Sequence, residues 1–211
     1  MIDSITRNLT WLGHDTFRLA VDNTILYFDP FRLTGAPPKA DIILVSHEHY
    51  DHCSPEDVAK IQKPDTLIIT DRQAANKLTG HIICLAQGEN HTVGSIKIEA
   101  VPSYNISKQF HPAANGWLGF IVTAKGISIY HAGDTDRIPE MKNFKVDIAL
   151  LPVSGTYVMT ADEAAQAALD LNPALAIPMH YGSIVGDRSD AERFASLLAG
   201  KIPVSLLPLQ Q

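Results

Sequence analysis

Short apolar runs alternate along this chain with polar segments that contain glycine and proline, a pattern typical of strands joined by turns and short helices. Near the amino terminus, residues 8–12, 16–21 and 24–28 predict an antiparallel meander, with Asp22 and Asn23 in a hairpin turn. Further strands are expected at residues 42–45, 66–70, 81–85, 96–101, 117–124, 126–131, 146–152 and 174–179, with a final edge strand at 204–207.

Helix-start signals separate several of these apolar runs. Residues 88–94 are expected to form a turn, and residues 102–116 an irregular loop. Because strands alternate with short helices, we predict an α/β protein rather than a pure β-sandwich. The expected helices are 55–62 after Ser54 and Pro55, 71–78 before Gly80, 161–171 from a capping box at Thr160 and Glu163, and one from Ser189 or Asp190 to Gly200.

One polar segment concentrates the side chains that bind metals. The residues His47-Glu48-His49-Tyr50-Asp51-His52 lie directly between an apolar run and a helix start. Imidazole and carboxylate are good ligands for borderline divalent ions such as zinc. Alternate side chains of an extended loop face the same way, so His47, His49 and Asp51 are expected to converge while His52 points elsewhere. This pattern favours two adjacent metal ions over a polar surface loop.

Other candidate ligands follow apolar strands further along the chain. Asp134 and His180 each lie just beyond a strand, and α/β folds place their chemistry on loops beyond the carboxyl ends of strands. His14, between the first two strands, either enters the site or faces solvent. Asp29, after the third strand, either forms a turn or orients a ligand histidine.

The segment from His47 to His52 resembles the H-x-H-x-D-H signature of the metallo-β-lactamase superfamily. The resemblance covers nearly the whole chain and looks closest to the compact branch that includes ascorbate-6-phosphate lactonase-like proteins and N-acylphosphatidylethanolamine phospholipase D. It implies a four-layer αββα sandwich, the metallo-β-lactamase fold. The supporting segments are Leu12-Gly13-His14, Phe28-Asp29-Pro30, Tyr130-His131-Ala132-Gly133-Asp134-Thr135 and Ile177-Pro178-Met179-His180-Tyr181.

The resemblance also implies which residues bind the metals. His47 and His49 would hold the first ion, Asp51, His52 and His180 the second, and Asp134 would bridge the two. The superfamily's usual third histidine on the first ion is missing, because the matching place reads Val101-Pro102-Ser103-Tyr104-Asn105. His111, in the irregular loop, is the replacement candidate, ahead of His14 and His91. If none of these binds, one ion would be held tightly and the other weakly.

By the same analogy the chain is expected to be a metal-dependent hydrolase of a small, anionic molecule. A metal-activated hydroxide would attack an ester, lactone or phosphoester bond, with Asp51 orienting or deprotonating the water. His14 would donate a proton or bind substrate, and Tyr157 and Tyr181 would either bind substrate or simply pack. One or two Zn²⁺ ions are expected, and Mn²⁺, Fe²⁺ or Ni²⁺ suit the same ligands. A phosphodiesterase or nuclease, and a non-catalytic metal-binding protein, remain as alternatives.

Length and composition narrow the possible partners. The 211 residues suffice for one buried core, so we expect a single domain over residues 1–211. A net charge of −6 argues against a nucleic-acid partner. No apolar run reaches membrane-spanning length, and no signal segment is visible. With Cys53 and Cys84 expected as free thiols, this predicts a cytoplasmic protein with a small-molecule substrate and no membrane partner. The pattern leaves the oligomeric state open.

Overall fold

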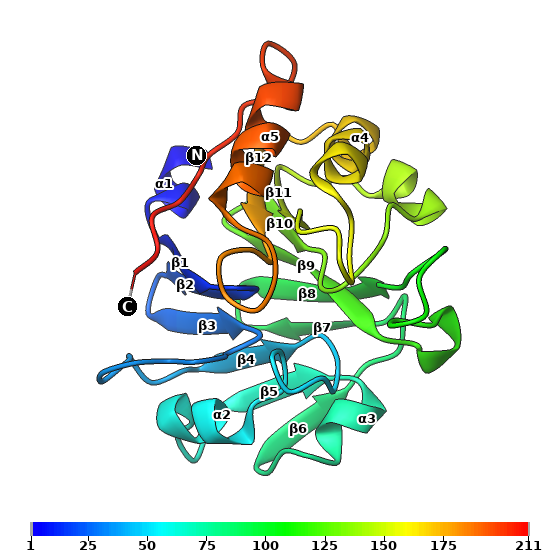
Figure 1. Ribbon diagram of the computed structural model, residues 1–211. Helices are drawn as coiled ribbons and strands as arrows, with labels where there is room; N and C mark the ends of the chain where they lie inside the picture. Colours follow the sequence, from blue (N-terminus) through cyan, green and yellow to red (C-terminus); the bar gives the residue numbers. More distant parts are fainter. Residues whose placement is uncertain (1, 211) are drawn as a thin grey trace.

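The computed structural model describes residues 2–210, which form two six-stranded sheets (Figure 1). The strands of the first sheet follow one another in chain order. They are β1 (Leu9–Gly13), β2 (Thr16–Val21), β3 (Thr24–Phe28), β4 (Ile42–Val45), β5 (Leu67–Thr70) and β6 (His81–Cys84). The second sheet has the order β12 (Leu175–Met179), β11 (Ile148–Pro152), β10 (Ile127–His131), β9 (Leu118–Ala124), β8 (Ile96–Pro102) and β7 (Asn90–Val93).

Each sheet has an antiparallel part and a parallel part. Strands β1 to β3 and β7 to β10 pair antiparallel, whereas β3 to β6 and β10 to β12 pair parallel. Parallel neighbours need crossover connections, and these carry most of the helices. The helices are α1 (Ile2–Thr6), α2 (Pro55–Ile61), α3 (Arg72–Ala75), α4 (Ala161–Leu171) and α5 (Arg188–Leu198), with short 3₁₀ turns η1 (Ala113–Asn115) and η2 (Pro139–Asn143).

The helices cover the outer faces of the two sheets. Figure 1 shows α2 and α3, in cyan, beside β4 to β6, and α4 and α5, in yellow and orange, beside β10 to β12. The order of layers is therefore helix, sheet, sheet, helix, which confirms the predicted αββα sandwich.

Strand β4 shows why its sequence is apolar at every position. Ile42 and Leu44 belong to the core between the sheets, whereas Ile43 and Val45 pack with Val58 of α2 in a second cluster on the helix side. A strand covered on both faces has no polar face, so its side chains do not alternate in polarity. The loop that follows β4 thus starts from a rigid, fully buried position.

The predicted strands and helices agree with the structure except at four places, and α1, η1 and η2 lie in segments for which no helix was predicted. Residues 90–93 form strand β7 rather than part of a turn, because they pair antiparallel with β8. This edge strand is partly exposed and mostly polar, so it lacks the apolar residues that would have predicted a strand. The helix expected at 71–78 is only α3, since the amide of Lys77 bonds to the carbonyl of Ala74 and tightens the chain into a turn.

The two other differences lie near the carboxyl terminus. Helix α5 is capped by Asp187, whose side chain accepts a 2.6 Å hydrogen bond from the amide of Ser189, and not by Ser189 or Asp190. Residues 204–207 form no strand, because only Val204 bridges to Ala176 of β12. The chain then leaves this sheet, and the amide of Gln210 bonds to a carbonyl of β1 in the other sheet.

Among residues 2–210, no helix combines the length and the apolar character needed to cross a membrane.

The core between the sheets gives a direct test of the fold. Phe120 of β9 is fully buried in that core, whereas Phe110 is 49% exposed. We expect Phe120→Ala to lower the free energy of unfolding by about 3–5 kcal/mol, because it removes buried area and leaves a cavity. The matched control Phe110→Ala should change it by less than about 1 kcal/mol. Urea unfolding followed by circular dichroism measures both, and equal losses would contradict this packing.

Candidate metal centre

The candidate ligands lie on loops that follow strands of both sheets. His14 follows β1, the segment from His47 to His52 follows β4, and Asp134 and His180 follow β10 and β12. His111 comes from the irregular loop between β8 and β9. Four of these strand ends point to the same edge of the sandwich, so residues far apart in the sequence come together there.

The first group consists of His47, His49 and His111, whose potential ligand atoms all lie within 4.8 Å of one another. His47 Nε2 is 3.0 Å from His49 Nδ1, and the rings of His47 and His111 are 5.2 Å apart. Trp117 packs against all three imidazoles. The structure therefore brings the replacement candidate His111 to the place left open by the missing superfamily histidine.

Asn105 holds His111 in that place. The backbone amide of Asn105 donates to the backbone carbonyl of His111 at 2.7 Å. The side-chain oxygen Oδ1 of Asn105 accepts from the backbone amide of His111 at 3.0 Å. The same Oδ1 lies 3.1 Å from His111 Nδ1. Since an amide oxygen only accepts, His111 carries a proton on Nδ1, and its Nε2 is directed at Asp134 Oδ2, 3.1 Å away. Asn105 thus occupies the usual ligand region and presents a histidine from six residues further on.

The second group consists of His14, Asp51, His52 and His180, which also offer ligand atoms within 4.8 Å of one another. His14 Nε2 is 3.1 Å from Asp51 Oδ2, and the rings of His14 and His180 are 4.1 Å apart. His14 is only 1% exposed and lies among the other ligand candidates, and its expected role beside the substrate stays a prediction.

Asp134 connects the two groups. Its Oδ1 lies 3.3 Å from Nε2 of both His52 and His180, and its Oδ2 lies 3.1 Å from His111 Nε2. A carboxylate with one oxygen toward each group would be able to hold an ion in each of them. This geometry supports the bridging role that the resemblance implies.

The loop that carries His47 to His52 is a turn, not an extended segment. The amides of His52 and Cys53 both donate to the carbonyl of His49, at 3.1 and 2.8 Å. The prediction that His47, His49 and Asp51 converge without His52 was therefore wrong. The turn sends His47 and His49 to the first group and Asp51 and His52 to the second.

Hydrogen bonds behind the ligands fix the orientation of their rings. Asp29 Oδ2 accepts from His52 Nδ1 at 2.8 Å and from Ser46 Oγ at 2.6 Å. Because the Ser46 hydroxyl gives its only proton to Asp29, it accepts from His47 Nδ1 at 2.9 Å. Asp29 is thus the partner that orients a ligand histidine, one of its two predicted roles. These bonds direct Nε2 of both histidines into the site, where His47 Nε2 meets His49 Nδ1 and His52 Nε2 has no hydrogen-bond partner.

The charged groups shift one another's pKa values. Burial alone would raise the pKa of Asp134, but His180, His52 and His111 hold it well below its usual value. Burial would lower the pKa of His180, but Asp134 and Asp15 raise it to about 9. Burial likewise opposes a charged His52, whose pKa the carboxylates of Asp134 and Asp29 nevertheless raise well above its usual value. A bound cation would replace protons as the positive partner of these carboxylates.

Several buried polar atoms of the site have no hydrogen-bond partner. They include Nε2 of His52, His111 and His180, together with Oδ1 of Asp134. Unpaired buried polar atoms are destabilising and therefore rare in proteins. Here they all point at the region between the two groups, and nitrogen and carboxylate ligands in this arrangement fit divalent metal ions. The residues present therefore fit the metals that the resemblance implies.

Some residues of the site had no clear signal in the sequence. Asp15 is fully buried, and its Oδ2 is 4.0 Å from His52 Nδ1. Ser154 Oγ lies 2.9 Å from His180 Nδ1 and orients that ring. The position of Asp15 beside His14 was a possible indication, whereas Ser154 follows a strand that ends without any metal-ligand residue. Only the packing of strands β11 and β12 brings Ser154 to His180.

The two tyrosines lie on different sides of the ligands. Tyr157 lines a cavity of about 220 Å³ over His49, Asp51 and Asp134, and its ring contacts Phe110 edge to face at 4.7 Å. Tyr181 is only 7% exposed and stacks on Trp11 at 4.8 Å, so packing is its main contact. Its role as a substrate-binding residue stays a prediction, as does that of Tyr157. His131, buried and stacked on Phe28, is structural.

The four layers and the ligands on one edge of the sandwich define a protein of the metallo-β-lactamase fold class. Residues 8–180 match the family model of the beta-lactamase superfamily domain, and the chain belongs to that family. The predicted membership of the superfamily is thus confirmed. The closer likeness to the lactonase-like branch stays a prediction.

Similar proteins cover nearly the whole chain. A UPF0173 metal-dependent hydrolase of Methanoculleus marisnigri is 34% identical over 196 residues, spanning 88% of this chain and 86% of that protein. A relative from Thermoplasma acidophilum with the same description is 35% identical, over 90% and 89% of the two chains. The crystal structure of a provisionally assigned metal-dependent hydrolase from Parabacteroides distasonis shares 37% identity and a TM-score of 0.87, over 96% and 93%.

The ligand assignment can be tested by metal content. We expect about two ions per chain in the wild type, falling toward one in His111→Ala, because the first group then keeps only two histidines. Elemental analysis of protein purified without added metal, and again after metal is offered, measures this. The control His81→Ala removes an exposed histidine of β6 and should keep the wild-type content. Equal metal content in all three proteins would show that His111 is no ligand.

Proposed function

We propose that this metal-dependent hydrolase cleaves an ester, lactone or phosphoester bond of a small, anionic molecule at the centre described above. The observation that carries the proposal is the position of Asp134 between His111 of the first group and His52 and His180 of the second, three buried histidines whose Nε2 atoms lack hydrogen-bond partners. When bound, the metals would supply Lewis acidity and a water of lowered pKa. The curated relatives are described as metal-dependent hydrolases, which supports the same class of enzyme.

Asp51 is the candidate base of this reaction. Its side chain is 14% exposed and lines the cavity over the ligands. Burial would raise the pKa of its carboxyl, but the hydrogen bond with His14 lowers it to about 2. Asp51 is therefore ionised at neutral pH and can accept a hydrogen bond from an attacking water.

The imidazole of His14 forms a hydrogen bond with Asp51 and is buried away from solvent. Burial lowers the pKa of His14 to about 4, so its imidazole is neutral near pH 7. Since the carboxylate only accepts, the proton of His14 lies on Nε2 and is donated to Asp51 Oδ2. We assign His14 the task of positioning Asp51, and its predicted role as a proton donor to the leaving group stays a prediction.

The cavity over the ligands favours a small substrate. Its volume is about 220 Å³, and Tyr50, Phe110, Tyr157 and Ile184 form its outer walls. A site of this size and apolar character fits a short acyl or aryl group. That no nucleic acid is a partner stays a prediction, based on the net charge of −6.

We further propose Zn²⁺ as the native metal, one or two ions per chain, because histidine nitrogens make up most of the ligands. Mn²⁺, Fe²⁺ and Ni²⁺ suit the same residues, so elemental analysis of the native protein decides. Both Cys53 and Cys84 are free, as expected for a cytoplasmic protein. The cytoplasmic location itself stays a prediction.

Activity of an Asp51 variant tests the proposed mechanism. We expect Asp51→Asn to lower kcat by about 10²–10⁴-fold on whichever ester, lactone or phosphoester the metal-loaded wild type hydrolyses, because the amide cannot accept the proton. The control Glu48→Gln changes an acid of the same loop that pairs with Lys77, and should keep the wild-type rate. Metal content is measured for each variant. An Asp51→Asn protein with full metal and full activity would remove Asp51 from the mechanism.

A further inference from the structure

Arg32 is a positively charged residue beside the metal centre without an acidic partner. Its Nη1 donates to Ser183 Oγ at 3.0 Å, and its guanidinium lies 5.0 Å from the centre of the Phe31 ring. Within residues 2–210, no carboxylate oxygen lies within 4.0 Å of this group. Other arginines of the chain, such as Arg137 and Arg193, pair with carboxylates at 2.6 Å.

The backbone of Arg32 is held in an uncommon conformation. Its φ of +51° lies in the left-handed region, which few residues other than glycine adopt. The carboxylate of Asp57 accepts from the amides of Arg32 and Leu33 at 2.8 and 2.9 Å. Asp57 is itself fixed by Ser54 and Lys60, each at 2.8 Å. Such strain persists only where the surrounding structure enforces it, and it often accompanies function.

The side chain of Arg32 forms one wall of a cavity of about 230 Å³. This cavity, here called the His14-side cavity, adjoins the reaction site, because His14 touches Asp51 and the ring of Phe31 lies 5.9 Å from that of Tyr50. Its other walls carry no acidic residue. They include His14, Phe31, Tyr181 and Ser183.

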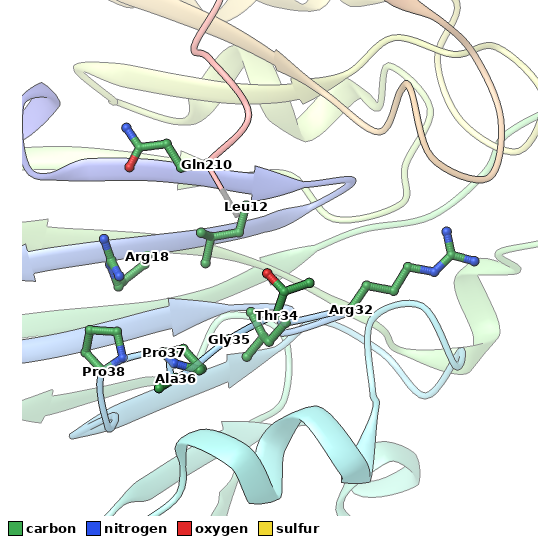
Figure 2. Close-up of a pocket in the computed structure, with 10 residues that line it drawn as sticks. Leu12, Arg18, Arg32, Thr34, Gly35, Ala36, Pro37, Pro38 and Gln210 are labelled. Atoms are coloured by element: carbon green, nitrogen blue, oxygen red, sulfur yellow. The ribbon is translucent and has the colours of Figure 1, made fainter.

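A second arginine nearby does not share this position. Figure 2 shows a neighbouring cavity in which Arg18 and Arg32 lie at opposite ends of the row of labelled residues, with Thr34 and Gly35 near Arg32. The guanidinium of Arg32 extends away from this cavity, in agreement with its bond to Ser183. Arg18 donates instead to Thr10 Oγ1 at 3.2 Å. The chain therefore provides a matched control for Arg32.

We propose that Arg32, supported by Ser183, binds an oxyanion of the substrate, a carboxylate or a phosphate, in the His14-side cavity. This inference rests on the proposed hydrolase function and names the residue that selects anionic substrates. A guanidinium presents paired N–H donors that match a carboxylate or phosphate, and its support by Phe31 and Ser183 reduces the ordering needed on binding. The scissile bond would lie next to Asp51 and the oxyanion a short distance away on the His14 side.

Three ester probes that differ only in their terminal group test the proposal. They are mono-4-nitrophenyl adipate, the 4-nitrophenyl ester of adipamic acid, and 4-nitrophenyl 5-phosphonopentanoate, which end in a carboxylate, a neutral amide and a phosphonate. For the metal-loaded wild type we expect a higher kcat/KM on at least one anionic probe than on the amide. In Arg32→Gln this preference should fall about tenfold or more, while Arg32→Lys should lose less because it keeps the charge. The probe whose kcat/KM falls in Arg32→Gln shows whether the bound oxyanion is a carboxylate or a phosphate.

Two controls separate this effect from a general loss. Arg18→Gln removes an equal charge from the neighbouring cavity and should keep the wild-type preference. Titration calorimetry with adipate and adipamide, on the metal-loaded proteins, measures binding without turnover. A preference for adipate that disappears in Arg32→Gln supports the proposal even if none of the esters is hydrolysed, in which case the ester chemistry alone fails. An unchanged charge preference in Arg32→Gln, or an equal loss in Arg18→Gln, would overturn it.

Discussion

The structure depends on a buried cluster of carboxylates and imidazoles at one edge of the sandwich. Asp134 lies at its centre, within 3.3 Å of His52, His180 and His111. So many buried polar atoms without hydrogen-bond partners are tolerated only if another group compensates for their lost hydration, and divalent cations do so. Metal binding thus accounts for the meeting of loops from both sheets at this edge of the sandwich.

The hydrogen bonds behind the cluster connect the metal centre to the fold. Asp29 at the end of β3 orients His52, and Ser154 beyond β11 orients His180. These partners follow strand ends that are buried on both faces, so their positions are rigid. Metal affinity and packing of the sheets are therefore coupled, and a change in the core can reach the ligands without touching them.

The sides of the centre differ in chemistry. Tyr50, Phe110 and Tyr157 form apolar walls over the first group of histidines, whereas Arg32 places a positive charge beside His14. A site with one apolar and one cationic side distinguishes the two ends of a substrate, which gives orientation as well as affinity. Family membership fixes the class of chemistry, and these walls decide which molecule is used.

The sequence by itself predicted an α/β fold and the metal-binding loop, and its resemblance to the metallo-β-lactamase superfamily predicted the four layers and the other ligands. Apolar runs marked the strands, and the spacing of His47, His49, Asp51 and His52 indicated a metal site, because both patterns depend on residues close together in the chain. It left the place of His111 open, since only the turn held by Asn105 brings that ring to the first group.

Tertiary structure alone decided the remaining features. The turn within the loop after β4 separated Asp51 from His47, against the alternation expected of an extended segment. Ser154 and Arg32 meet their partners His180 and Ser183 across large separations in sequence, so no local pattern could reveal them. Ligands that are close together in the chain can be predicted from residue spacing. Contacts between distant loops depend on how the two sheets pack.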